Sequence, residues 1–221
     1  MHGNLDPTKL YTTGEEVFNA VSHGVGSLLA VVGTSVLVTL AAQRGDAGAV
    51  AVCLIYGLSL IVLYTMSTLY HAFRDERTKR FFRVLDHSTI YLLIAGSYTP
   101  FLLLLLRGSV WCAVLCCLLW ALALVGIGLN AVSVDRFAKI SMALYIGMGW
   151  AAVFALPQML RALSPGGFAL LVGGGLCYTG GIVFYKLQHR LRYMHGVWHL
   201  FVLAGSILHY VCILQDVLPR V

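Results

Sequence analysis

Seven long stretches without a charged residue dominate the sequence. They cover residues 17–43, 47–73, 87–106, 108–134, 140–160, 162–185 and 193–215. Each reaches the roughly 20 residues that an α-helix needs to cross the hydrocarbon core of a bilayer, where backbone polar groups must be paired within the segment. Only 11% of the 221 residues are charged, against roughly 25% in a soluble domain. The sequence therefore predicts an all-α, seven-transmembrane helical bundle.

The connections between these stretches are short, and no linker or low-complexity run interrupts the chain. Short connections favour antiparallel neighbours within one bundle. We therefore predict a single integral membrane domain over residues 1–221, with spans near 20–42, 48–73, 84–106, 109–131, 139–158, 166–185 and 195–214. The first stretch follows Glu15 and Glu16 instead of a basic region and lacks a convincing cleavage pattern, so we expect it to be retained as a span.

The net charge of +6 comes from the loops and the terminal segments. With seven spans, eleven Lys and Arg residues share the side of the amino terminus and four lie on the other side. They are Lys9, Arg74, Arg77, Lys79, Arg80, Arg83, Arg136, Lys139, Lys186, Arg190 and Arg192 on the first side, and Arg44, Arg107, Arg161 and Arg220 on the second. The positive-inside rule then predicts a cytoplasmic amino terminus and an outside carboxyl terminus. This rule also explains the basic charge, so we expect no nucleic-acid partner.

Histidines gather at the predicted cytoplasmic end of the bundle. His195 and His199 are four residues apart, which places both rings on one helix face, as two ligands of one metal ion require. The topology brings His71, at the end of the second span, to the same depth. Three histidines with an open fourth position are typical of a catalytic zinc centre, which acidifies its water. The alternative is a polar belt of histidines at the membrane interface.

A general base for such a centre must come from another helix, because His195 to His199 lacks the glutamate of the H-E-x-x-H motif. Asp86, at the start of the third span, is our candidate. The alternative for Asp86 is a carboxylate that caps the helix or pairs with loop arginines. Ser67 lies one turn before His71 and could bond the metal-bound water, or else a backbone carbonyl of its own helix.

Two further histidines lie near this predicted site. His87 follows Asp86 and is rotated from it by about 100° around the helix, so we assign it an indirect or structural role. His23, near the start of the first span, is either a neighbour of the site or a packed histidine.

Four segments of the chain form a recognisable set. They are 16–24, 67–71, 85–91 together with 96–101, and 195–199. As a set they resemble the hemolysin III family, the bacterial branch of the superfamily that contains the progestin and adiponectin (adipoQ) receptors. The resemblance covers nearly the whole chain.

This resemblance implies a seven-span bundle with a zinc ion (Zn2+) near the cytoplasmic leaflet, in what we expect to be the bacterial inner (plasma) membrane. It implies that His71, His195 and His199 hold the metal and that Asp86 and Ser67 approach it through water. Similarity to the adiponectin receptor branch and to alkaline ceramidases implies a membrane lipid as substrate or ligand.

Three classes of function remain open at this point. The leading hypothesis is a zinc-dependent intramembrane hydrolase of lipid amides or esters, ceramidase-like, with a role in membrane lipid homeostasis. The second is a zinc-stabilised receptor or stress sensor without catalysis. The third is a hemolysin or cytolysin, as the family name implies. Transport is the weakest hypothesis, because the span interiors offer few carboxylates for a proton relay.

Overall fold

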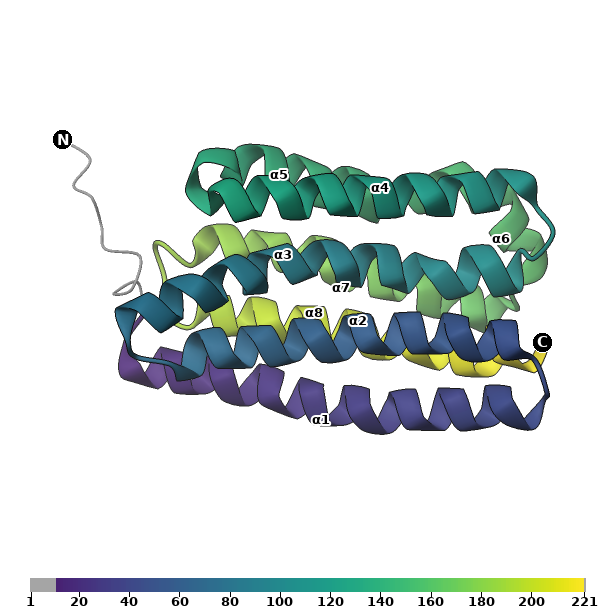
Figure 1. Cartoon of the computed structure of the whole chain (residues 1–221), viewed down its shortest axis with the longest axis horizontal. Helices are drawn as coiled ribbons and strands as arrows, with labels where there is room; N and C mark the ends of the chain where they lie inside the picture. Colours follow the sequence, from purple (N-terminus) through teal and green to yellow (C-terminus); the bar gives the residue numbers. More distant parts are fainter. Residues whose placement is uncertain (1–10, 221) are drawn as a thin grey trace.

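The computed structural model describes residues 11–220, which form an all-α bundle whose long helices run side by side (Figure 1). The main helices are α1 (Thr13–Gln43), α2 (Ala47–Ala72), α3 (Glu76–Pro100), α4 (Val110–Val132), α5 (Val134–Gly149), α6 (Leu156–Ala162), α7 (Pro165–Leu187) and α8 (Met194–Cys212). Within the described residues, seven helical segments are long and apolar enough to cross a membrane. The predicted fold class and the number of spans are thereby confirmed.

Side-chain caps explain where most of these helices begin. A helix start leaves backbone N–H groups without partners, and an oxygen of a preceding side chain can accept from one of them. The capping residues are Thr12 for α1, Asp46 for α2, Asp75 for α3, Ser109 for α4, Ser133 for α5 and Ser164 for α7. The turns between the helices are therefore encoded locally.

Two spans differ from the simple helices that the sequence suggested. The third begins at Glu76, so about three turns at 3.6 residues per turn lie before the charge-free stretch, and it continues past Pro100 as a π-helical turn, Phe101–Leu105. The fifth is interrupted: α5 ends at Gly149, a 3-10 turn follows over Ala151–Ala155, and α6 then begins with a proline in its first turn. Glycine ends helices readily and proline starts them, which accounts for the break.

The third span lies at the centre of the bundle. It packs against α2, α4 and α5, while α8 packs against α7 and α1. In its most apolar window, 72% of the residues are buried, against 17% in α7. Large apolar side chains such as Leu28 and Val110 are exposed on the outside of the bundle. Such a surface suits lipid, and the buried side chains of α3 consequently line the interior where a functional site can form.

A close contact between α3 and α4 depends on Gly126. A Cβ atom added at Gly126 would overlap the ring of Tyr91, which is fully buried. Gly126→Ala should therefore lower the free energy of unfolding by about 1–3 kcal/mol, as overpacking in cores does. Gly128→Ala is the matched control on the same helix, because nothing lies within 4 Å of a Cβ at that position. Thermal unfolding in detergent measures both variants, and equal stability would contradict the predicted steric clash.

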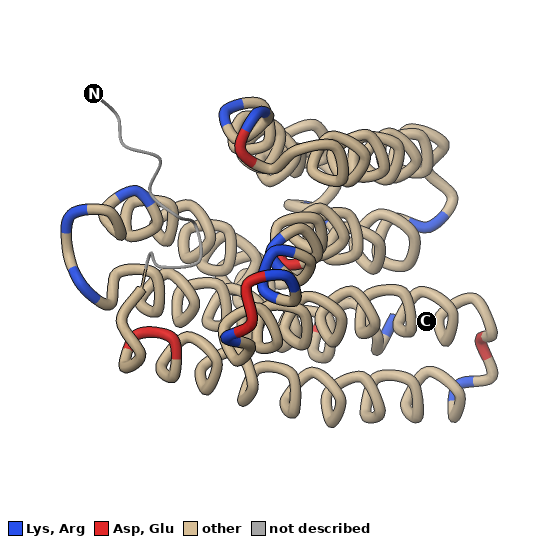
Figure 2. The backbone as a smooth tube through the Cα atoms, turned by 60° about the vertical axis from the view of Figure 1, so that its left-hand side comes forward, with Lys and Arg blue, Asp and Glu red and all other residues tan. Residues whose placement is uncertain are grey.

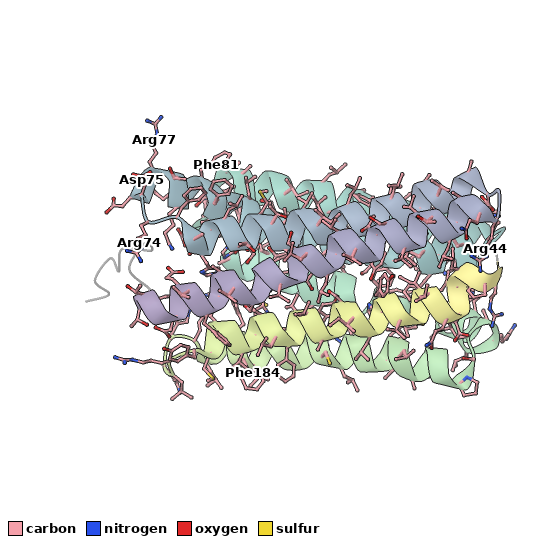
Figure 3. All side chains as sticks on the ribbon, turned by 90° about the horizontal axis from the view of Figure 1, so that it is seen from below. Arg44, Arg74, Asp75, Arg77, Phe81 and Phe184 are labelled. Carbon is pink, nitrogen blue, oxygen red and sulfur yellow. The ribbon has the colours of Figure 1, made fainter. Side chains whose placement is uncertain are left out.

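Charged residues gather near the turns and helix ends, as the coloured backbone in Figure 2 shows. Arg74 and Arg77 project from one end of the bundle and Arg44 lies at the other (Figure 3). At the second end, Arg107 binds Asp46 at 2.6 Å and holds the pKa of that carboxyl at about 2. The cytoplasmic orientation of the amino terminus stays a prediction from the charge bias, to which Lys9 contributes from outside the described residues.

Candidate metal centre

The three histidines predicted as metal ligands lie together inside the bundle. His71 comes from the last turn of α2, and His195 and His199 come from the first two turns of α8. All three are at most 5% exposed. Their ring centroids are 4.6–5.1 Å apart, and one potential ligand atom of each lies within 4.8 Å of the others. This buried cluster could hold a metal ion.

The outer nitrogen of His71 and that of His195 face oxygen atoms that can only accept. His71 Nδ1 lies 2.6 Å from the carboxylate Oε2 of Glu16. His195 Nδ1 lies 2.5 Å from the amide Oε1 of Gln188, which also accepts from the hydroxyl of Tyr11 at 2.6 Å. The Tyr11 hydroxyl also lies 3.0 Å from His195 Nδ1, but it gives its proton to Gln188. Because the Glu16 and Gln188 oxygens carry no proton to give, both Nδ1 atoms are assigned as donors. In a neutral imidazole, the Nε2 atom then carries the lone pair.

His199 reaches the same state through a different pair of oxygens. Its Nδ1 lies 3.3 Å from the carbonyl oxygen of Asn19 and 3.2 Å from Oγ of Ser22. Ser22 donates its own proton to the Asn19 carbonyl at 2.9 Å, so its oxygen is available to accept from His199. His199 Nδ1 is therefore also a donor, and its Nε2 also carries a lone pair.

All three Nε2 atoms are buried and have no hydrogen-bond partner within residues 11–220. A buried polar atom without a partner costs about 1–3 kcal/mol, so three such atoms in one cluster require an explanation. Ligating histidines in metal sites characteristically donate the other ring N–H to an oxygen, which fixes the tautomer and the ring orientation. The donor set therefore fits a metal ion that accepts three neutral imidazole nitrogens.

The start of α8 is shaped to bring His195 close to α1. Tyr193, which precedes the helix, has a positive φ of 63°, and its backbone N–H donates to Oε1 of Glu15 at 2.8 Å. A Cβ atom at Gly196 would overlap the ring of Phe18, so glycine permits the close approach of the two helices. The helix therefore enters the bundle with His195 and His199 turned toward the interior.

Tyr11 covers the cluster at the end of the bundle where the described chain begins. Its ring centroid lies 4.9 Å from that of His195 and 5.7 Å from that of His71. Burial raises the pKa of the Tyr11 hydroxyl, so it stays protonated and can donate to Gln188. Sequence reasoning missed both Tyr11 and Gln188. They lie in segments without helical periodicity, where no pattern in the sequence marks them.

Asp86 and Ser67 are both buried, and the structure excludes the helix-cap role considered for Asp86 and the backbone hydrogen bond considered for Ser67. Asp86 lies well inside α3, whose amino-terminal cap is Asp75, so Asp86 is not a helix cap. Ser67 Oγ has no hydrogen-bond partner among the described residues, so it does not bond a carbonyl of its own helix. In the described part of the chain, the group of potential ligands contains only the three histidines. Contact of Asp86 and Ser67 with a metal through water is thus a proposal.

His23 and His87, the two histidines expected near the site, have different neighbours. His23 is 2% exposed and stacks on His199 with ring centroids 3.5 Å apart, so it is a direct neighbour of the cluster. His87 Nδ1 lies 3.0 Å from the carbonyl oxygen of Arg83, to which it donates, and 3.5 Å from Oδ2 of Asp86. His87 therefore contacts the predicted base rather than the other histidines.

A cavity of about 420 Å³ begins beside the cluster, where His195, His23 and Asp86 line it. It extends to His209, fourteen residues beyond His195 on α8, which is about 21 Å at 1.5 Å per residue. Most of its other lining side chains are apolar and come from α3, α5 and α7. The cavity is therefore long and mostly apolar, with His195, His23 and Asp86 at one end and His209 at the other.

A multi-pass integral membrane protein with a buried three-histidine cluster is the class that this fold and site define. The chain belongs to the haemolysin-III-related family, whose model matches residues 11–210. It is 42% identical over 205 residues to Hemolysin-3 of Bacillus cereus, covering 93% of each chain. It is 40% identical to the Hemolysin-3 homolog of Bacillus subtilis (strain 168), over 93% of this chain and 95% of the relative. The human monocyte to macrophage differentiation factor is 27% identical over 91% of this chain and 84% of its own.

Proposed function

We propose that this protein is a zinc-dependent hydrolase that cleaves an amide or ester bond of a membrane lipid. The observation that carries the proposal is the convergence of three lone-pair Nε2 atoms beside a long apolar cavity that also reaches a buried carboxylate. We further propose that the amino-terminal end of the bundle faces the cytoplasm and that the membrane is a bacterial inner membrane. The charge bias supports the orientation, and the two Bacillus relatives support the membrane.

The donor set supports zinc among the biological metals. Three neutral imidazoles and one open position make up a known form of catalytic zinc site. Calcium and magnesium prefer oxygen ligands instead, and the cluster itself offers nitrogen. When bound, zinc would supply an open position at which water becomes acidic near neutral pH and a carbonyl oxygen is polarised.

The shape of the cavity supports an amphiphilic substrate. An acyl chain fits the apolar length, and the carbonyl at its head would then lie at the end of the cavity that His195 and Asp86 line. Three of the lining side chains, Trp150, Val153 and Leu176, are more than half exposed on the lipid-facing surface. A lipid can therefore enter from the bilayer through the side of the bundle between the break in the fifth span and α7.

Asp86 is the general base of the proposed reaction. Its carboxylate accepts a proton from the attacking water while the water oxygen bonds to the carbonyl carbon. The same carboxyl then delivers the proton to the leaving nitrogen or oxygen as the C–N or C–O bond breaks. The products are a fatty acid and an amine or alcohol. Ser67, whose hydroxyl has no partner among the described residues, hydrogen-bonds the water and holds it in place.

A hydrolysis assay tests the proposal directly. Detergent-purified protein is incubated with a ceramide and with an acyl ester of matched chain length, and mass spectrometry measures the fatty acid released. We expect release by the parent, loss of activity after chelation, and recovery when Zn2+ is added back. If the zinc-loaded protein releases nothing while chelation still lowers its melting temperature, the metal is a structural link and the receptor or sensor hypothesis replaces ours.

The name of the Bacillus cereus relative, Hemolysin-3, refers to the lysis of red cells. We place hydrolysis before lysis because the cavity and the buried Asp86 provide for a reaction inside the bundle. The test is haemoglobin release from red cells. Release by the purified parent protein, together with no release by zinc-site variants, would favour the cytolysin hypothesis over ours.

A further inference from the structure

Glu16 joins a ligand histidine to a buried lysine. Its Oε2 accepts from His71 Nδ1 at 2.6 Å, and its Oε1 accepts from Lys79 Nζ at 2.5 Å. The three residues come from the first turns of α1, the last turn of α2 and the first turn of α3. Figure 1 shows the start of α1 and the turn between α2 and α3 at the same end of the bundle. One carboxylate thus connects three helices at the metal centre.

Lys79, which the positive-inside count included among the basic residues of the amino-terminal side, is buried. Its side chain is 5% exposed, whereas that of its neighbour Arg80 is 62% exposed. Burying an unpaired ammonium group is very costly, so a buried lysine needs close compensation. Lys79 has it: besides Glu16, Nζ donates to the carbonyl oxygen of Tyr70 at 3.3 Å and lies 4.9 Å from the centroid of the Tyr70 ring. The lysine is therefore held in place for the carboxylate.

The three ligand histidines are not supported alike. Only His71 faces a carboxylate, while His195 faces an amide oxygen and His199 faces a hydroxyl and a backbone carbonyl. A carboxylate that accepts the outer N–H of a ligating histidine fixes the ring and makes the inner nitrogen a better donor to the metal. The strongest such support in this cluster therefore falls on the single ligand contributed by α2.

We propose that the Glu16–Lys79 pair is a positioning element of the metal centre: Glu16 orients His71 toward the ion, and Lys79 holds Glu16 in the buried position from which it does so. This inference rests on the proposed metal centre and assigns to it two residues that do not touch the metal. The positioning role also explains why Lys79 is buried, whereas the neighbouring Arg74, Arg77 and Arg80 are exposed.

The test compares zinc affinity in two variants that differ only in which carboxylate at this end of the bundle is lost. Glu16→Gln should weaken Zn2+ binding about 10–100-fold, the usual effect of losing such a partner. Glu76→Gln is the control, because Glu76 is an exposed carboxylate in the first turn of α3, at the same end of the bundle, that pairs with Arg80 and contacts none of the three histidines. Competition with a chromophoric chelator measures affinity, and the melting temperature of the metal-free form measures folding separately.

Lys79 provides an independent arm of the same test. Lys79→Met keeps the apolar stem and removes the charge, so Glu16 loses its anchor and zinc affinity should fall, whereas Arg80→Met should leave it unchanged. The Glu16→Gln/Lys79→Met double variant should bind zinc about as weakly as Glu16→Gln alone, because the two residues act as one unit. With Co2+ as the probe, Glu16→Gln should shift the visible absorption bands and Glu76→Gln should not.

The outcomes separate this proposal from the proposed function. If the parent binds zinc and Glu16→Gln binds it equally well, the positioning role is wrong and the metal centre stands. Equal weakening by Glu16→Gln and Glu76→Gln also overturns the positioning role, because the effect would then belong to this end of the bundle as a whole. A folded parent that takes up no zinc contradicts the metal centre itself.

Discussion

The His195→Ala/His199→Ala double variant is expected to contain no zinc, whereas the parent carries about one zinc per chain. Two of the three converging Nε2 atoms disappear in the variant, and the remaining His71 alone is too few ligands to hold a structural or catalytic ion. Elemental analysis of the two detergent-purified proteins measures the difference. His189→Ala is the matched control, because His189 is exposed and lies outside the cluster.

The same variant should also lose the stabilisation that zinc provides. A ligand that binds only the folded state adds about 4 kcal/mol to the free energy of unfolding when present at 1,000 times its Kd. Added Zn2+ should therefore raise the melting temperature of the parent and of His189→Ala, and leave that of the double variant unchanged. Equal zinc content in parent and double variant, with both folded, would refute the assignment of these histidines as ligands.

The sequence predicted those residues of the site whose positions follow from helical spacing and from the order of the spans. His195 and His199 are related by helical spacing alone, and the count of spans was enough to bring His71 to their depth. Both inferences use only periodicity and topology, which the pattern of charges fixes in a membrane protein. The same pattern also predicted the all-α bundle and its seven spans, now found in the described residues.

Periodicity and topology could not predict the hydrogen-bond partners of the three histidines. Lys79 was counted only as one of the basic residues on the amino-terminal side, because a sequence does not reveal that its side chain turns inward to meet Glu16. One signal was present: Glu16, Asn19 and Ser22 recur at helical spacing along one face of an otherwise apolar helix. Ionisable and polar residues on such a face usually point to the bundle interior. That face could have been assigned to the site, although not its individual hydrogen bonds.

Hydropathy also could not predict the break in the fifth span. A window of apolar residues predicts that a segment lies in the membrane, but it does not distinguish one continuous helix from two. The glycines at 147 and 149 and the proline at 157 were the local signals. The interruption matters for function because Trp150 and Val153, on the broken segment, line the cavity and are exposed to lipid.

Asp86→Asn is expected to lower the rate of lipid hydrolysis by about 10²–10⁴-fold, the usual contribution of a general base, while zinc content stays near one per chain. The asparagine keeps the shape of the buried side chain and removes its ability to take up a proton. Asp86 is not among the grouped metal ligands, so the ion should be retained. Asp135→Asn is the control, because Asp135 is an exposed carboxylate that pairs with Arg83 at the end of the bundle. Turnover by Asp86→Asn at the parent rate would remove Asp86 as the base, whereas loss of zinc together with activity would make it part of the metal site.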